Sequence, residues 1–205
     1  MIPAAEALAR LREGNRRFVS SVGEGSPPGA RRIELTREQW PFAIILGCSD
    51  SRVPSELVFD QGLGDLFVIR VAGNIVAPSQ VGSVEFAASR FETKLVVVMG
   101  HTQCGAILAT LEEIQRPAEK QSPNLRSIVE RVRPSVEILL KSGARPDSAE
   151  LVDQAVRANI RASVNHLRHG SEILEGLFRT EDLRVVGAEY SLATGAVDFF
   201  YQDVR

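Results

Sequence analysis

Residues 42–52 read Phe-Ala-Ile-Ile-Leu-Gly-Cys-Ser-Asp-Ser-Arg. The first five are apolar and rich in isoleucine, which is typical of a short strand buried on both faces, as in parallel sheets. Polar side chains follow at once, with Cys48, Asp50 and Arg52 at alternate positions. In open α/β sheets, ligands bind beyond the carboxyl ends of the strands. The stretch therefore predicts a buried parallel strand with a functional site at its end.

Further short apolar runs of the same kind alternate with longer segments of helical periodicity. The other predicted strands are residues 66–71, 95–99 and 183–186. The predicted helices between and after them are residues 79–91, 106–115, 124–140 and 148–169. Strand followed by helix, repeated, implies right-handed crossovers. The fold class expected is α/β, with a mostly parallel central sheet flanked by helices on both faces.

The two ends of the chain add peripheral elements to this plan. Residues 3–20 place apolar side chains at helical spacing among charges, so we expect an amphipathic N-terminal helical arm lying on the larger body. Residues 197–201 are expected to form an edge strand or an arm used in assembly. Segments rich in glycine, proline and polar residues, 21–32 and 143–147, are expected to be loops.

Length and composition limit the function classes. A chain of 205 residues with 44% hydrophobic and 24% charged residues predicts one folded domain spanning residues 1–205. A net charge of −2 gives no electrostatic reason to expect nucleic acid or an anionic membrane as partner. No apolar run is long enough for a membrane span, and charges interrupt the N-terminus where a signal peptide would be apolar. We expect a cytoplasmic protein, or a periplasmic one if a signal peptide has been removed.

A second strand end carries chemistry of its own. The predicted strand at 95–99 is followed by Gly-His-Thr-Gln-Cys-Gly, which places His101 and Cys104 three residues apart at the opening of a helix. Cys48 and Cys104 are the two cysteines of the chain. Two thiolates and an imidazole are a zinc ligand set with one position left open, which is the arrangement of catalytic zinc. The alternative interpretation is two buried cysteines that act as small apolar residues and a histidine bonded within a loop.

The runs Cys48-Ser49-Asp50-Ser51-Arg52 and His101-Thr102-Gln103-Cys104-Gly105 closely resemble the two signature motifs of the β-class carbonic anhydrases. The resemblance extends through residues 59–62, 67–74 and 82–86. It implies Zn²⁺ on Cys48, His101 and Cys104, and reversible hydration of carbon dioxide to bicarbonate and a proton. It also implies a homodimer or a homotetramer.

Asp50 and Arg52 fit a catalytic pair beside such a metal. Hydroxide held by zinc is the expected nucleophile. Asp50 can accept its hydrogen and aim a lone pair at carbon, or it can swing in as a fourth metal ligand and close the site. Arg52 is placed to hold Asp50 away from the metal by a charge-assisted hydrogen bond. The alternative is an ordinary surface contact between an aspartate and an arginine.

The substrate is small and apolar, so its pocket should be mainly hydrophobic with a few polar donors. Resemblance to the plant-type members implies that Gln39 donates a hydrogen bond to bicarbonate and that the Gly105 N–H faces the ligand. It also implies that Phe67 and Ala72 line the pocket. Plant enzymes carry a tyrosine where this chain has Phe86, so a hydroxyl contact from that position is lost.

A subgroup of the family has a regulatory bicarbonate pocket built partly on a tryptophan three residues before the first cysteine ligand. This chain has Ile45 there, which implies an enzyme without that regulation, although Arg70 matches another component of the pocket.

Three other functions stay open from the sequence. A related zinc hydrolase acting on carbonyl sulfide or carbon disulfide could use the same metal ligands. A metal-free hydrolase could use Cys48 as nucleophile with His101. A non-catalytic zinc-binding sensor would keep the metal without turnover.

Overall fold

The computed structural model describes residues 1–20, 34–36, 38–116, 122–142, 149–180 and 182–201. Its centre is a five-stranded sheet in the order β2-β1-β3-β4-β5. The strands are β1 (Ala43–Gly47), β2 (Leu66–Arg70), β3 (Leu95–His101), β4 (Arg184–Tyr190) and β5 (Val197–Tyr201). The first four are parallel, whereas β5 runs antiparallel to β4 at one edge. The α/β fold class and the mostly parallel sheet are confirmed.

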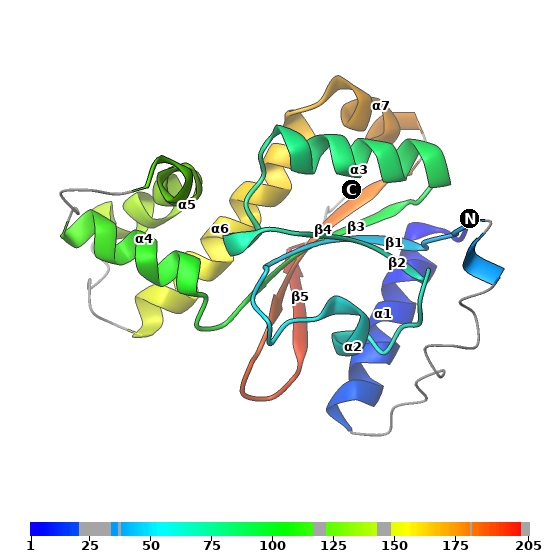
Figure 1. The fold of residues 1–205 in the computed structure, drawn as a ribbon, viewed down its shortest axis with the longest axis horizontal. Helices are drawn as coiled ribbons and strands as arrows, with labels where there is room; N and C mark the ends of the chain where they lie inside the picture. Colours follow the sequence, from blue (N-terminus) through cyan, green and yellow to red (C-terminus); the bar gives the residue numbers. More distant parts are fainter. Residues whose placement is uncertain (21–33, 37, 117–121, 143–148, 181, 202–205) are drawn as a thin grey trace.

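Helices cover both faces of this sheet (Figure 1). The first group is α1 (Ala4–Val19) and the short α2 (Ser55–Val58), which lie on one side. The second group is α3 (Pro78–Phe91), α6 (Ala149–His169) and α7 (Glu172–Thr180), which lie on the other side. The third group is α4 (Gly105–Gln115) and α5 (Pro123–Lys141), which pack on each other beside α6. Two single-turn 3₁₀ helices, η1 (Glu34–Thr36) and η2 (Ala72–Asn74), complete the described elements.

Burial explains why the central strands read as unbroken apolar runs. All five residues of β1 and all seven of β3 are buried, because helices pack on both faces. Alternate residues of each strand serve two separate cores. Ile44 and Leu46 face the α3–α7 side, whereas Ala43 and Ile45 face α1. The N-terminal helical arm is present as α1, and its buried Ala7 and Leu11 belong to the second core.

The predicted elements are found with shifted ends. β3 and β4 continue beyond their apolar runs, to His101 and Tyr190, because these two residues pair with each other in the parallel ladder. Residues 197–201 form the edge strand β5, the first of the two expected alternatives. α2 and α7 were not predicted. The predicted loops at 21–32 and 143–147 lie outside the described residues.

In the part of the chain that the structure describes, no helix is both long and apolar enough to cross a bilayer. The cytoplasmic location stays a prediction from the sequence.

Candidate active site

The sheet topology brings together the two strand ends that carry the cysteine and histidine residues. β1 and β3 are parallel neighbours, so their carboxyl ends lie at the same edge of the sheet. His101 is the last residue of β3, and Cys48 directly follows β1. Cys104 stands directly before the first residue of α4. One ligand atom from each of the three side chains lies within 4.8 Å of the other two, and all three residues are buried. The structure therefore assembles a candidate metal centre from positions 48, 101 and 104.

His101 is set up to offer one nitrogen to a cation. Its ring is fully buried, and Nδ1 lies 2.9 Å from the carbonyl oxygen of Thr102, to which an Nδ1–H would donate. Nε2 is buried and has no hydrogen-bond partner among the described residues. A neutral imidazole with a protonated Nδ1 presents a lone pair on Nε2. An otherwise unpartnered buried nitrogen beside two sulfurs fits a soft divalent metal.

The two cysteines do not behave as independent thiols. A hydrogen bond with the Cys104 thiol is the main cause that lowers the pKa of Cys48 to about 4, and His101 and the Gly73 N–H add to it. The same hydrogen bond with Cys48, together with burial, raises the pKa of Cys104. Burial by itself would lower the pKa of His101, but the Cys48 sulfur and the Thr102 carbonyl outweigh it and raise that pKa. These contacts favour the thiolate form of Cys48, the form in which cysteine binds metals.

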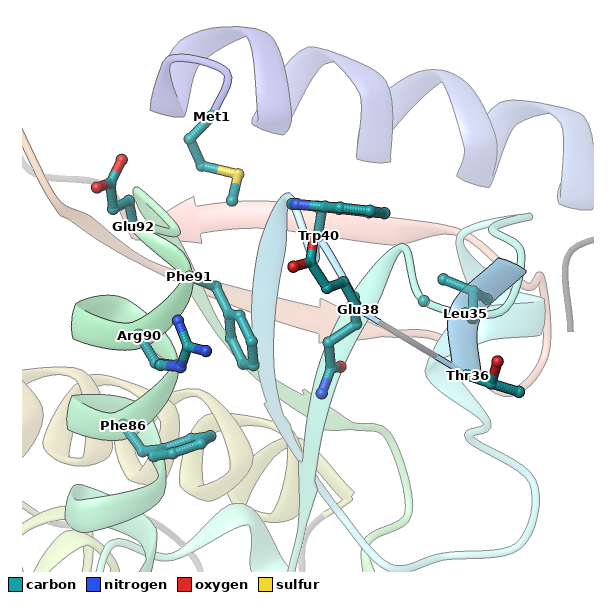
Figure 2. A pocket seen from close by; sticks show the side chains of 11 residues that line it. Met1, Leu35, Thr36, Glu38, Trp40, Phe86, Arg90, Phe91 and Glu92 are labelled. Atoms are coloured by element: carbon teal, nitrogen blue, oxygen red, sulfur yellow. The ribbon is translucent and has the colours of Figure 1, made fainter. Parts of the chain in front are cut away.

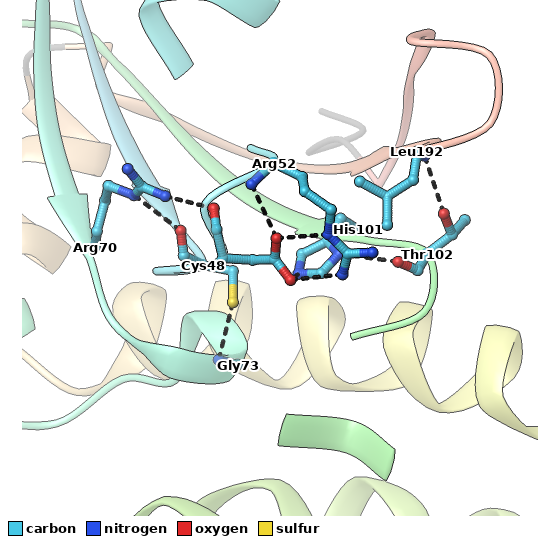
Figure 3. A network of polar contacts seen from close by, with 8 residues as sticks. Cys48, Arg52, Arg70, Gly73, His101, Thr102 and Leu192 are labelled. Atoms are coloured by element: carbon cyan, nitrogen blue, oxygen red, sulfur yellow. Dashed lines mark hydrogen bonds and ion pairs between the residues drawn. The ribbon is translucent and has the colours of Figure 1, made fainter. Parts of the chain in front are cut away.

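Asp50 and Arg52 form a two-point contact beside His101 of this cluster. Figure 3 shows Arg52 next to His101. Arg52 Nε donates to Asp50 Oδ1 at 2.9 Å, and a terminal guanidinium nitrogen donates to Oδ2 at 2.7 Å. The backbone N–H of Arg52 donates to Oδ1 as well. These hydrogen bonds hold the pKa of Asp50 well below its usual range. Asp50 Oδ2 lies 3.8 Å from His101 Nε2, so an ionised carboxylate borders the metal centre.

Three comparisons with known proteins show what this chain is similar to. The sequence profile of the carbonic anhydrase family matches residues 43–197. The carbonic anhydrase of Mycolicibacterium smegmatis is 38% identical over 193 residues, which cover 94% of this chain and 91% of the relative. Carbonic anhydrase 2 of Mycobacterium tuberculosis is 37% identical over 190 residues, covering 92% and 89%. The structure of the β-carbonic anhydrase CafA of Aspergillus fumigatus matches with a TM-score of 0.73 at 25% identity, over 96% of this chain and 89% of that one.

The chain belongs to the β-carbonic anhydrase family. A β-carbonic anhydrase of Sordaria macrospora, described as tetrameric, shares the fold with a TM-score of 0.76, covering 97% of this chain and 100% of that one. Its identity is 20%, so this likeness concerns the fold alone.

The residues expected to bind substrate in such an enzyme divide into two groups. Ala72 and Gly105 lie close to the ligands, in η2 and at the first position of α4. Gln39 and Phe86 instead line a cavity of about 820 Å³ with Trp40, Arg90 and other residues (Figure 2). Phe67 packs against Phe86, with their ring centroids 6.2 Å apart. The described residues that line this cavity include none of the metal-ligand candidates.

The length of β1 separates the cavity residues from the metal-ligand candidates. Gln39 precedes β1 and Cys48 follows it, and the five residues of β1 span roughly 16 Å at about 3.3 Å per residue. Within one chain, Gln39 therefore does not reach the metal centre. Phe86 is 55% exposed and Trp40 is 60% exposed, so two large aromatic side chains face solvent in walls that also hold Glu38, Arg90 and Glu92.

Part of the support around the metal-ligand candidates was not predicted from the sequence. Arg70, opposite Gly47 in the β1–β2 ladder, donates to the carbonyl oxygen of Cys48 at 3.0 Å and to that of Asp50 at 2.6 Å (Figure 3). Gly73 donates its N–H to Cys48 Sγ at 3.4 Å. The sequence feature that could have indicated this support was Arg70, a charged residue at the end of the apolar strand β2. The family resemblance had linked Arg70 to a regulatory pocket instead.

Proposed function

We propose that this chain catalyses the zinc-dependent reversible hydration of carbon dioxide to bicarbonate and a proton, with residues 1–205 acting as one catalytic domain. Its family membership supports a carbonic anhydrase. The observation that carries the assignment is the buried Cys48, His101 and Cys104 cluster with the paired Asp50 at its rim. Zinc, when bound by these three residues, is a Lewis acid that makes water nucleophilic near neutral pH.

Asp50 orients the reacting water. Its carboxylate stays ionised because Arg52 donates two hydrogen bonds to it, so it accepts a hydrogen bond and does not donate one. An acceptor fixed beside the metal centre turns a lone pair of the water oxygen toward the carbon of the substrate. Arg52 also occupies both carboxylate oxygens, which keeps Asp50 from becoming a fourth metal ligand and closing the site.

The Arg70 side chain supports the segment after β1 through the backbone carbonyl groups of that segment. One guanidinium group bridges the carbonyl oxygens of Cys48 and Asp50, so the metal-ligand candidate and the orienting carboxylate are fixed relative to each other. A rigid support of this kind favours catalysis because small displacements of a reacting group are costly.

We infer that the substrate pocket is completed by a second copy of the chain. Gln39, Phe67 and Phe86 stand at the opposite end of β1 from Cys48, whereas Ala72 and Gly105 stand beside it. A two-fold dimer places the same surface of each copy against the other. The exposed aromatic side chains of Trp40 and Phe86, together with Arg90 beside them, are suited to such an interface. In this arrangement Gln39 of one copy would donate a hydrogen bond to bicarbonate at the metal centre of the other.

Substrate assays on the zinc-loaded protein test the assignment. We expect hydration of carbon dioxide, followed with a pH indicator in stopped flow, to be far faster than hydrolysis of carbonyl sulfide or carbon disulfide. A preference for either sulfur substrate would assign the related hydrolase instead. Bound zinc without turnover of any of the three would assign a sensor.

A further inference from the structure

The η2 turn, Ala72–Asn74, has an unusual backbone. Gly73 has φ +70° and Asn74 has φ +43°, so two consecutive residues occupy the left-handed region. Asparagine is enriched in this region among non-glycine residues, so the residue types at positions 73 and 74 both suit the turn. A Cβ on Gly73 would also lie 3.0 Å from the Cβ of Ala106. Contacts from elsewhere in the fold add to this local preference.

Helix α6 supplies those contacts through two polar side chains. Asn159 Nδ2 donates to the carbonyl oxygen of Gly73 at 2.8 Å, and Ser163 Oγ donates to that of Asn74 at 3.0 Å. The two side chains are four residues apart, on one face of the helix. Both are buried, among apolar residues such as Ile160. Their positions match two adjacent carbonyl groups of the turn.

The other side of the same turn faces the metal centre. The Gly73 N–H donates to Cys48 Sγ at 3.4 Å, in a buried setting. A donor to a thiolate sulfur stabilises its charge and tunes its bond to a metal. One residue thus connects α6 to Cys48, because its carbonyl oxygen accepts from Asn159 while its N–H donates to the sulfur.

We propose that Asn159 and Ser163 are positioning residues that hold the 72–74 turn so that the Gly73 N–H stays on the Cys48 sulfur, and that they thereby set how tightly the site retains its metal. The proposal rests on the zinc site of the proposed function. Neither residue is one of the metal-ligand candidates, and both side chains donate to carbonyl oxygens of the turn. Asn159 has the larger effect, since it holds the residue that donates to sulfur, whereas Ser163 holds the next one.

Zinc release to an excess of a chromophoric chelator, at fixed pH, tests the proposal on the zinc-loaded protein. We expect Asn159→Ala to release zinc about tenfold faster than the parent, in line with the loss of an outer contact to a metal ligand. Ser163→Ala should release it faster than the parent but by a smaller factor. The control is Val164→Ala, which removes a buried side chain from the same helix without removing a hydrogen bond to the turn.

A second readout reports the sulfur directly. In the cobalt-substituted protein, the thiolate-to-metal charge-transfer absorption should shift in Asn159→Ala and stay in place in Val164→Ala. If Asn159→Ala does not fold, Ser163→Ala carries the same two measurements with a single hydroxyl removed.

The outcomes separate this proposal from the proposed function. A parent protein that retains no zinc would overturn the proposed function. A parent that retains zinc, with position 159 and 163 variants that match its release rate and spectrum, would overturn the positioning role alone. Equal acceleration by Val164→Ala would overturn it too, because general loosening of α6 would then be the cause.

Discussion

Arg52 donates hydrogen bonds to both carboxylate oxygens of Asp50, at 2.9 and 2.7 Å, while Asp50 Oδ2 lies 3.8 Å from His101 Nε2. In the proposed function, this pairing with Arg52 is what keeps the Asp50 carboxylate from becoming a fourth ligand of bound zinc.

Arg52→Ala should retain zinc and lose at least an order of magnitude in turnover, because Asp50 is released toward the metal. Arg52→Lys should recover only part of the loss, since a lysine cannot make the two parallel hydrogen bonds. A matched control is Arg16→Ala, which breaks an exposed ion pair with Glu13 and should cost less than about 1 kcal/mol of stability with no change in turnover. Stopped-flow assays and metal analysis of the same samples measure both quantities. Activity of Arg52→Ala near that of the parent would reject the gating role.

Bicarbonate should act on this enzyme as a simple product, with hyperbolic inhibition. Ile45 is fully buried where the regulated subgroup has a tryptophan, and the Arg70 side chain already bridges the Cys48 and Asp50 carbonyl oxygens. Initial rates against bicarbonate at constant pH and ionic strength provide the measurement. A sigmoidal loss of activity would show that a regulatory pocket forms without the tryptophan.

If the active site spans two copies of the chain, two inactive variants should regain activity when they are combined in a mixed dimer. We expect Gln39→Ala and Cys48→Ser each to lower activity strongly when present alone. In a mixed dimer, one site receives both intact groups and the other receives neither, so co-expression should recover activity in proportion to the mixed species, up to about half of the parent value per mixed dimer. Mixed dimers isolated with two different affinity tags serve for the assay. No recovery in verified mixed dimers would place Gln39 and Cys48 in the same site or remove Gln39 from catalysis.

We expect the stability of the protein to depend on pH through Glu189. Its Oε2 accepts from Arg157 Nε at 2.8 Å, but its Oε1 is buried without a partner among the described residues. Burial is the main cause that raises the pKa of Glu189, against the lowering effect of Arg157. A raised folded-state pKa contributes stability below the unfolded-state value of about 4.3, and that contribution is lost as pH rises through the folded-state value.

Glu189→Gln keeps an acceptor for Arg157 and removes this titration. The free energy of unfolding of the variant, relative to the parent, should therefore increase as pH rises from 4 to 7. Urea titrations of both proteins across that range measure it. A difference that stays constant or falls with rising pH would contradict the assigned direction.

The central strands and the three metal-ligand candidates could be predicted from sequence because their signals are local. Unbroken apolar runs mark strands buried on both faces, and cysteine and histidine directly after two such runs mark one edge of the sheet. α7 was missed although Ser171 caps it through the N–H of Leu174, a signal that a search for capping residues would have found. The extension of β4 to Tyr190 could not be predicted from local pattern, because its register with β3 sustains it.

The supports of the site were beyond sequence reasoning for a different physical reason. Asn159 and Gly73 are 86 positions apart, and Arg70 is 22 positions from Cys48, so only the folded chain shows that they meet. The division of the predicted substrate residues between two ends of β1 likewise required the strand to be placed. Asn159 and Ser163, two polar residues within an apolar helix face, were irregularities visible in the sequence.

Zinc content and carbon dioxide hydration, measured together on the parent and on Cys48→Ser, His101→Ala and Cys104→Ser, test the central claim most directly. The account predicts about one zinc per chain in the parent, with each variant losing metal and turnover in parallel. A parent protein that is fully active without zinc would contradict it.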